Sequence, residues 1–319
     1  MSRCRNIPVV MYHSINGHPE EHPLGFLAFS PDELRQHLRY FNDAGYTLLT
    51  LAELWQRTIA GCFGNERIAV LTFDDGFLDN YLVAGEILAE AGAKATVFVN
   101  PGHAPAGSPR TMRDTPNAWG YLNFNEMRDM QASGIFDIQS HTWTHEKVFS
   151  SSRLIDFYSP EKFDKYQWLT WFLYPETMNQ WEGDVRRFAQ RIPAGYPVFE
   201  HNRGLPTRRF IPHDSFVEKC IDAFVSRGPD AMTALASETD RGDYESEAEH
   251  DSRMHHQICD AAETIEKELG QDVIGVCFPG GAYNEKSLGI ARTAGHRLYM
   301  LSSRDQRGNN LAALRSADK

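Results

Sequence analysis

Long apolar runs, paired cysteines and an excess of basic residues are all lacking in this 319-residue sequence. No stretch of about 18 uninterrupted apolar residues occurs, so the sequence predicts no membrane-spanning helix. The five cysteines are an odd number, scattered without a C-x-x-C pair or disulfide-rich spacing, which favours free thiols in a reducing compartment. The formal net charge of −11 gives no broad basic surface, so we expect no nucleic-acid partner.

The beginning of the chain lacks the hydrophobic region of a secretory signal peptide, because Pro8 and His13 interrupt its apolar run. Met1 precedes the first predicted strand by only a few residues. Together with the free cysteines and the acidic composition, these features predict a cytoplasmic protein. The alternative is an exported protein whose leader has been removed.

Strand-like and helix-like segments alternate on both sides of a long central region. Residues 30–45 are typical of a helix, with Ser30 as the N-cap, Gly45 as the stop, and apolar residues at helical spacing, namely Leu34, Leu38 and Phe41. Short segments rich in β-branched and aromatic residues predict strands at 7–13, 46–50, 68–73, 94–100 and 135–140. This alternation predicts an α/β fold, a mostly parallel sheet covered by helices and either open or closed into a barrel.

The alternation is lost from about residue 146 and returns near residue 253. Trp, Tyr, Phe and Pro are frequent up to about residue 237, and the acidic residues 238–251 are interpreted as an exposed loop or the start of a solvated helix. We therefore predict a single domain over residues 1–319 with an insertion at 146–252. The aromatic side chains of the insertion favour a small hydrophobic core, although such rings can also stack on sugars.

Two adjacent carboxylates, Asp74 and Asp75, follow the predicted strand 68–73 directly. Neighbouring side chains on an extended segment point to opposite faces, so the two carboxylates should have different surroundings. An Asp-Asp-Gly sequence is also common in simple strand-to-helix turns. A second polar strand end, which carries His141 and His145, favours a functional role instead.

The two histidines lie four residues apart, a spacing that places both imidazoles on one side of a helical turn. The carboxyl ends of parallel strands meet at one face of the sheet, so Asp75, His141 and His145 can converge there. A carboxylate and two imidazoles make a three-ligand site for a divalent metal ion, with a position left for water. Asp74 is then free to accept a proton from that water. The alternative is a pair of surface histidines.

The segments TFDDG, SHTWTH and FPGGAYN resemble the first three motifs of the polysaccharide deacetylase, or NodB-homology, family. With VVMYHSI at residues 9–15, the chain is most similar to the branch containing poly-β-1,6-N-acetylglucosamine deacetylases. In that branch, circular permutation places a strand-end histidine of the fifth motif near the N-terminus. The resemblance covers residues 7–145 and 253–303, and it implies a distorted (β/α) barrel of the NodB-homology type with a long insertion.

The resemblance implies metal-dependent removal of acetyl groups from an N-acetylated glycan, with release of acetate. The divalent ion would be zinc, with cobalt, nickel or iron as alternatives, held by the three ligands above. Asp74 would be the general base and His13 the general acid toward the leaving amine. From the third motif, the Gly280 N–H would contribute to the oxyanion hole, and Tyr283 would belong to the substrate-binding segment.

The sequence departs from the family pattern at Cys277, where the family often has an arginine that orients the catalytic aspartate. Arg208 and Arg209 are candidates to replace it, because Gly204 and Pro206 mark a bend in the insertion; a solvated arginine pair is the alternative. Gly280 also stands where an aromatic residue is usual. Two other functions stay open: hydrolysis of a small amide or O-acetyl ester, and glycan binding without catalysis, which the full set of motif residues disfavours.

Overall fold

The structure is a computed structural model that describes residues 7–17, 25–180, 185–235 and 237–301. The chain separates into two compact units. The first comprises residues 1–144, 179–183 and 256–319, and the second comprises residues 145–178 and 184–255. Each is described below by itself, and the organisation as one domain with an insertion stays a prediction.

A parallel sheet forms the centre of the first unit, as the sequence predicted. Its strands are β1 (Val9–Tyr12), β4 (Tyr46–Leu49), β5 (Arg67–Phe73), β6 (Ala95–Val99), β7 (Phe136–Ser140), β12 (Gly275–Cys277) and β13 (Leu298–Met300). The order is β1-β5-β6-β7-β12-β13, and β4 pairs with β5. Every pairing in this sheet is parallel, so the carboxyl ends of the strands meet at one edge. The fold is a curled half-barrel of the predicted distorted (β/α)-barrel type.

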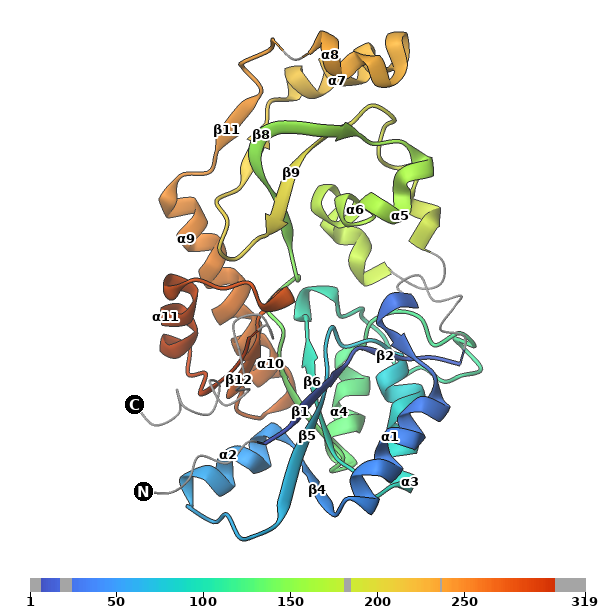
Figure 1. The fold of residues 1–319 in the computed structure, drawn as a ribbon, viewed down its shortest axis with the longest axis vertical. Coiled ribbons are helices and arrows are strands. Elements are labelled where there is room, and N and C mark those ends of the chain that lie inside the picture. The colour runs from blue at the N-terminus through green and yellow to red at the C-terminus, as the bar shows by residue number, and fades with distance from the viewer. Residues whose placement is uncertain (1–6, 18–24, 181–184, 236, 302–319) are drawn as a thin grey trace. The chain divides into compact units, whose positions relative to one another are not determined.

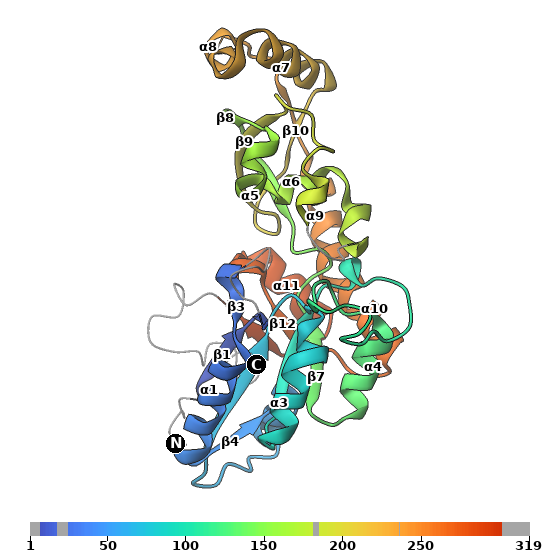
Figure 2. The ribbon, with the colours of Figure 1, turned by 90° about the vertical axis from the view of Figure 1, so that its right-hand side faces the viewer.

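Helices surround this sheet, as Figures 1 and 2 show for α1, α3 and α4. The helices of the first unit are α1 (Pro31–Asp43), α2 (Leu51–Ile59), α3 (Gly85–Glu90), α4 (Phe124–Ala132), α10 (Ala261–Leu269) and α11 (Glu285–Thr293). The predicted N-cap Ser30 forms a capping box with Glu33, and Gly45 follows α1 with φ of 70°. Within the described residues, no helix combines the length and the hydropathy needed to cross a bilayer.

Two apolar layers, one on each face of the sheet, hold the first unit together. Alternate side chains of β5 face opposite layers: Leu71 and Phe73 pack with α1 and α3, whereas Ile68 and Val70 pack with Leu54 of α2. This alternation follows the two-residue period of a strand. Because both faces of the strand are buried, its sequence is a continuous apolar run that ends where the polar edge begins.

The second unit has its own sheets and core. Strands β8 (Lys147–Phe157) and β9 (Pro197–Arg203) pair in antiparallel fashion, as do β10 (Phe210–Pro212) and β11 (Gly242–Tyr244). Helices α5 (Phe163–Tyr166), α6 (Trp168–Leu173), α7 (Asp214–Arg227), α8 (Ala231–Ala234) and α9 (Glu247–His255) complete it (Figure 2). Aromatic side chains are buried throughout the unit, including Phe149, Tyr158, Trp168, Phe199 and Phe216. The aromatic residues of this region therefore form the small hydrophobic core that the sequence favoured.

The interpretation of residues 238–251 as a loop or solvated helix start was wrong in part. Strand β11 lies within this stretch, and Glu245, which follows it, is only 2% exposed. The stretch has few aliphatic residues, so its hydropathy resembles that of a solvated segment. Ion pairs and backbone hydrogen bonds hold this stretch in place. A hydropathy scale does not measure such interactions.

Candidate active site

Five polar side chains lie where the strands of the parallel sheet end. His13 follows β1, Asp74 and Asp75 follow β5, His141 follows β7, and Cys277 is the last residue of β12. Backbone hydrogen bonds continue the ladder into these positions: the Asp74 N–H donates to Tyr12 O (2.9 Å), and the His141 N–H donates to Val99 O (2.8 Å). The regular ladder therefore fixes the backbone from which these side chains project.

Asp74 is buried, with 4% of its surface exposed. Its Oδ2 atom accepts a hydrogen bond from the Cys277 thiol at 3.3 Å. Burial raises the pKa of Asp74, and the charges of His141 and His13 act in the opposite direction. Cys277 therefore lies beside the carboxylate, at the position where the sequence resemblance led us to expect an arginine.

The three predicted metal ligands come together at this edge. One ligand atom from each of Asp75, His141 and His145 lies within 4.8 Å of the other two. The Asp75 Oδ1 atom is 3.4 Å from His141 Nε2. Burial opposes the charged form of His141, but the two carboxylates Asp75 and Asp74 outweigh it and raise its pKa.

The backbone that brings these ligands together differs from the predicted helical turn. Residues 141–146 are not helical, and Thr142 and His145 have φ of 67° and 50°. Asp75 also has a left-handed φ of 72°, so it does not continue the extended strand. These conformations are uncommon for residues with a Cβ, and for β-branched Thr142 the strain is greatest. Tight turns, rather than helical or strand geometry, orient the ligands.

The imidazole of His141 fits a metal site. Its Nδ1 atom is 2.8 Å from the backbone oxygen of Cys277. If Nδ1 carries the proton and donates to this oxygen, Nε2 is left with a lone pair toward Asp75. A backbone carbonyl that orients a ligating histidine in this way is a usual feature of protein metal sites. The donor set of one carboxylate and two imidazoles suits zinc, cobalt, nickel or iron.

Polar residues next to His13 hold its backbone in place. The side chain of Asn80 donates to His13 O (2.8 Å) and to Asp79 Oδ1 (3.1 Å). The Ser14 hydroxyl donates to Asp79 Oδ2 at 2.5 Å. Asp79 and Asn80 are fully buried, so this network ties the start of the chain to the segment after β5.

Asp79 should make stability depend on pH. Burial raises its pKa from 3.8 to about 7, so between these values the folded state binds a proton that the unfolded state has lost. Asp79 makes its greatest contribution to the free energy of unfolding below pH 3.8. This contribution falls as the pH rises toward about 7. The side chain of the Asp79→Asn variant cannot titrate, so we expect the stability of the wild type relative to this variant to fall between pH 3.8 and about 7 and to level off above.

Denaturant unfolding at several pH values measures this difference. Asp32→Asn, on an exposed side chain of α1, is the matched control and should show no such trend. Parallel stability profiles for the wild type and Asp79→Asn would contradict the assignment.

Three further polar residues support the site and were not singled out in the sequence. The Asn100 side chain donates to Thr142 O (3.0 Å), and the Gln257 side chain bonds both the N–H and the hydroxyl of Thr144 (3.1 and 2.9 Å). His103 is 1% exposed and packs on Tyr121 at 4.7 Å between ring centroids. Burial lowers the pKa of His103 to about 3, so it is neutral. Asn100 and His103 follow β6, so the rule that polar residues gather at parallel strand ends would have found both.

The residues of the third motif form a turn after β12. Gly280 has φ of 58°, which glycine adopts readily, and the Gly281 N–H donates to Phe278 O at 2.7 Å. The Tyr283 ring lies 5.8 Å from the ring of Phe278. The oxyanion role of the Gly280 N–H and the substrate-binding role of Tyr283 stay predictions.

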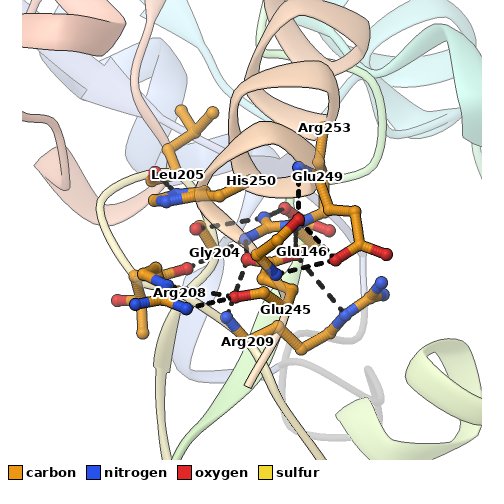
Figure 3. A network of polar contacts seen from close by, with 11 residues as sticks. Glu146, Gly204, Leu205, Arg208, Arg209, Glu245, Glu249, His250 and Arg253 are labelled. Atoms are coloured by element: carbon orange, nitrogen blue, oxygen red, sulfur yellow. Dashed lines mark hydrogen bonds and ion pairs between the residues drawn. The ribbon is translucent and has the colours of Figure 1, made fainter. Parts of the chain in front are cut away.

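Arg208 and Arg209, predicted as replacements for the missing arginine, belong to a network inside the second unit (Figure 3). The guanidinium of Arg208 donates to Glu245 O (3.0 Å from Nε), and the Arg209 backbone N–H donates to Glu245 Oε1 (2.7 Å). Arg253 bonds Glu146 and Glu245 as well as the backbone oxygen of Thr207. Both candidate arginines thus have carboxylate or carbonyl partners here, and their role beside Asp74 stays a prediction.

Arg253 should be essential for the stability of the second unit. Its side chain is 10% exposed, and Glu245 beside it is 1% exposed, so Arg253→Met removes the guanidinium that bonds this buried carboxylate most closely. We expect a loss of about 3–5 kcal/mol in the free energy of unfolding, measured by denaturant unfolding. Arg153→Met removes an exposed pair with Glu200 in the same unit and should cost far less, because solvent screens such pairs. Equal losses in the two variants would contradict the prediction.

Comparison with known proteins finds one matching family. Residues 64–178 match the family model described as polysaccharide deacetylase. YxkH, a polysaccharide deacetylase homologue of Bacillus subtilis (strain 168), is 30% identical over 142 residues, which are 44% of this chain and 43% of YxkH. The match therefore spans less than half of that relative.

Several solved structures superpose on most of this chain. A de-N-acetylase from Aggregatibacter actinomycetemcomitans superposes with a TM-score of 0.59 at 16% identity, covering 93% of this chain and 88% of that one. The BpsB deacetylase domain from Bordetella bronchiseptica gives 0.57 at 17% identity with the same coverage. The Streptococcus pyogenes deacetylase PplD, in complex with acetate, gives 0.51 at 20% identity, covering 93% and 84%. At these identities the likeness shows the fold.

Proposed function

We propose that this chain, which carries a polysaccharide deacetylase domain, hydrolyses the acetamido groups of an N-acetylated glycan and releases acetate. One observation carries the proposal. A buried carboxylate, Asp74, stands beside a separate set of metal-binding groups at the carboxyl edge of the sheet. Hydrolysis of an amide at neutral pH needs both an activated water and a base to take its proton.

Asp75, His141 and His145 would hold the divalent ion, for which zinc is our first candidate. When bound, such an ion supplies a Lewis acid that polarises the acetyl carbonyl and lowers the pKa of water toward neutrality. The hydrogen bond between His141 Nδ1 and the backbone oxygen of Cys277 orients the imidazole, so that Nε2 faces Asp75. Asp74 does not belong to this set of ligands, so its carboxylate is available as the general base.

Asp74 accepts the proton of the attacking water. Its pKa is raised by burial, which moves the base toward the working pH and makes proton transfer more favourable. His13, whose charge acts on Asp74, donates a proton to the sugar nitrogen as acetate leaves. The Gly280 N–H contributes a hydrogen bond to the developing oxyanion.

Acetate release distinguishes this proposal from its alternatives. Purified protein should release acetate from N-acetylglucosamine oligomers when supplied with zinc, cobalt, nickel or iron. Preference for acetyl-xylan or for a small amide would identify an esterase or an amidase with the same residues. No release from any of these substrates, together with binding of the oligomers, would identify a glycan-binding protein.

We also propose that the protein acts in the cytoplasm, on a glycan precursor before its export. Free cysteines and an acidic composition support this location. Fractionation of the native host with an antibody against the protein tests it, and a periplasmic or surface pool would contradict it without affecting the chemistry.

A further inference from the structure

A second group of potential ligands overlaps the first. One ligand atom from each of Asp74, His141 and Cys277 lies within 4.8 Å of the other two. All three side chains belong to the first unit and are buried, with 4%, 1% and 7% of their surfaces exposed. Asp74 Oδ1 is buried and has no hydrogen-bond partner within the described part of the chain. An unpartnered carboxylate oxygen in such a site is costly unless another group binds it.

We propose that Asp74, His141 and Cys277 form an alternative site for a thiophilic divalent ion such as Zn²⁺ or Cd²⁺, and that its occupation switches the enzyme off. Binding forms a bond from the ion to the Cys277 sulfur, and the thiol proton leaves to solvent. A thiolate and a carboxylate together neutralise the two positive charges of the ion. The first set contains a single carboxylate and leaves a net charge, whereas the alternative set leaves none on a buried ion.

The two sets exclude one another because they share His141. Its Nδ1 atom faces the carbonyl oxygen of Cys277 at 2.8 Å, so Nε2 is the nitrogen left for an ion. An ion in the alternative set also takes the Asp74 carboxylate, and the base is then no longer available to accept a proton. This inhibitory consequence rests on the proposed function, whereas the binding itself does not.

The Cys277 sulfur gives this site a thiolate ligand in addition to a carboxylate and an imidazole. Its thiol already points to Asp74, as the hydrogen bond from Sγ to Oδ2 at 3.3 Å shows. Burial and the neighbouring carboxylate raise the pKa of the thiol, so without an ion it stays protonated. A hard ion that prefers oxygen ligands gains little from sulfur, so the alternative set selects against Mg²⁺ and Mn²⁺.

Titration of the metal-free full-length protein with Cd²⁺ tests the proposal. The starting protein carries Cys4→Ser, Cys62→Ser and Cys259→Ser, which leaves only the buried Cys220 and Cys277 as thiols. We expect one Cd²⁺ per chain with the ultraviolet charge-transfer absorbance of a cadmium–thiolate bond. Mn²⁺ alone should give no such absorbance.

Two added variants separate the alternative set from the first. Cys277→Ser should lose the absorbance, whereas His145→Ala, outside the alternative set, should keep it. Persistence of the absorbance in Cys277→Ser, or its loss in a folded His145→Ala protein, would overturn the proposal. Circular dichroism verifies folding, and Cys277→Ala serves as a second variant if the serine protein is unstable.

An activity measurement tests the inhibitory consequence separately. Excess Zn²⁺ should reduce acetate release by the starting protein and have a smaller effect on Cys277→Ser. Equal inhibition of both proteins would overturn the switch. A protein that released no acetate at all would refute the proposed function, while the Cd²⁺ titration would still decide whether the alternative set binds an ion.

Discussion

Asp74→Asn is expected to lower the rate of acetate release by about 10²-fold or more, because general-base catalysis typically contributes that much. The substitution keeps the shape of the side chain and removes its ability to accept a proton from water. Asp74 does not belong to the set Asp75, His141 and His145, so the metal content should not change. Steady-state kinetics and metal analysis of the same preparation measure both quantities.

Asp137→Asn is the matched control for this substitution. Asp137 is also a buried carboxylate, but it lies within β7 and accepts hydrogen bonds from Ala52 N–H and Thr96. Its variant should retain turnover when folded. Near-normal turnover in Asp74→Asn would mean that another group is the base.

Removing two of the proposed metal ligands should have the largest effect of all. The double variant Asp75→Ala, His141→Ala is expected to purify without the ion and to lose activity by at least about 10³-fold, because a metal ion contributes several kcal/mol to the transition state. Elemental analysis and acetate release measure the two losses.

A double variant of one aspartate and one histidine outside the site controls for the number of substitutions. Asp32→Ala with His255→Ala changes exposed residues of α1 and α9 and should keep both metal and activity. Wild-type metal content in the Asp75→Ala, His141→Ala protein would place the ion elsewhere.

The sequence was sufficient to predict the parallel sheet and the polar residues at its edge. The continuous buried run of β5 and the capping box at Ser30 arise from residues close together in the chain, so they are visible in the sequence pattern itself. The strand ends and the histidine spacing singled out Asp74, Asp75, His141 and His145, and the family resemblance then added His13, Gly280 and Tyr283.

Contacts between residues far apart in the sequence could not be predicted from local patterns. The hydrogen bond of Asn80 to His13 O joins residues 67 positions apart, and that of Cys277 to Asp74 joins residues 203 positions apart. The buried Glu245 was missed for the same reason, since its order depends on Arg253 and Arg209. Backbone strain at Thr142 and His145 was also unpredictable, because only the folded surroundings hold such conformations in place.

The left-handed backbone at Asp75 bears on how such a site can be lost in evolution. Aspartate and asparagine both tolerate a φ of 72°, so the exchange of one for the other at this position adds little backbone strain. A single base change converts an aspartate codon into an asparagine codon. A descendant with Asp75→Asn would keep its backbone conformation, but it would lack the negative charge of the proposed metal-ligand set. If the proposed function is right, one mutational step could therefore convert this enzyme into a protein that lacks the metal ion and keeps its fold.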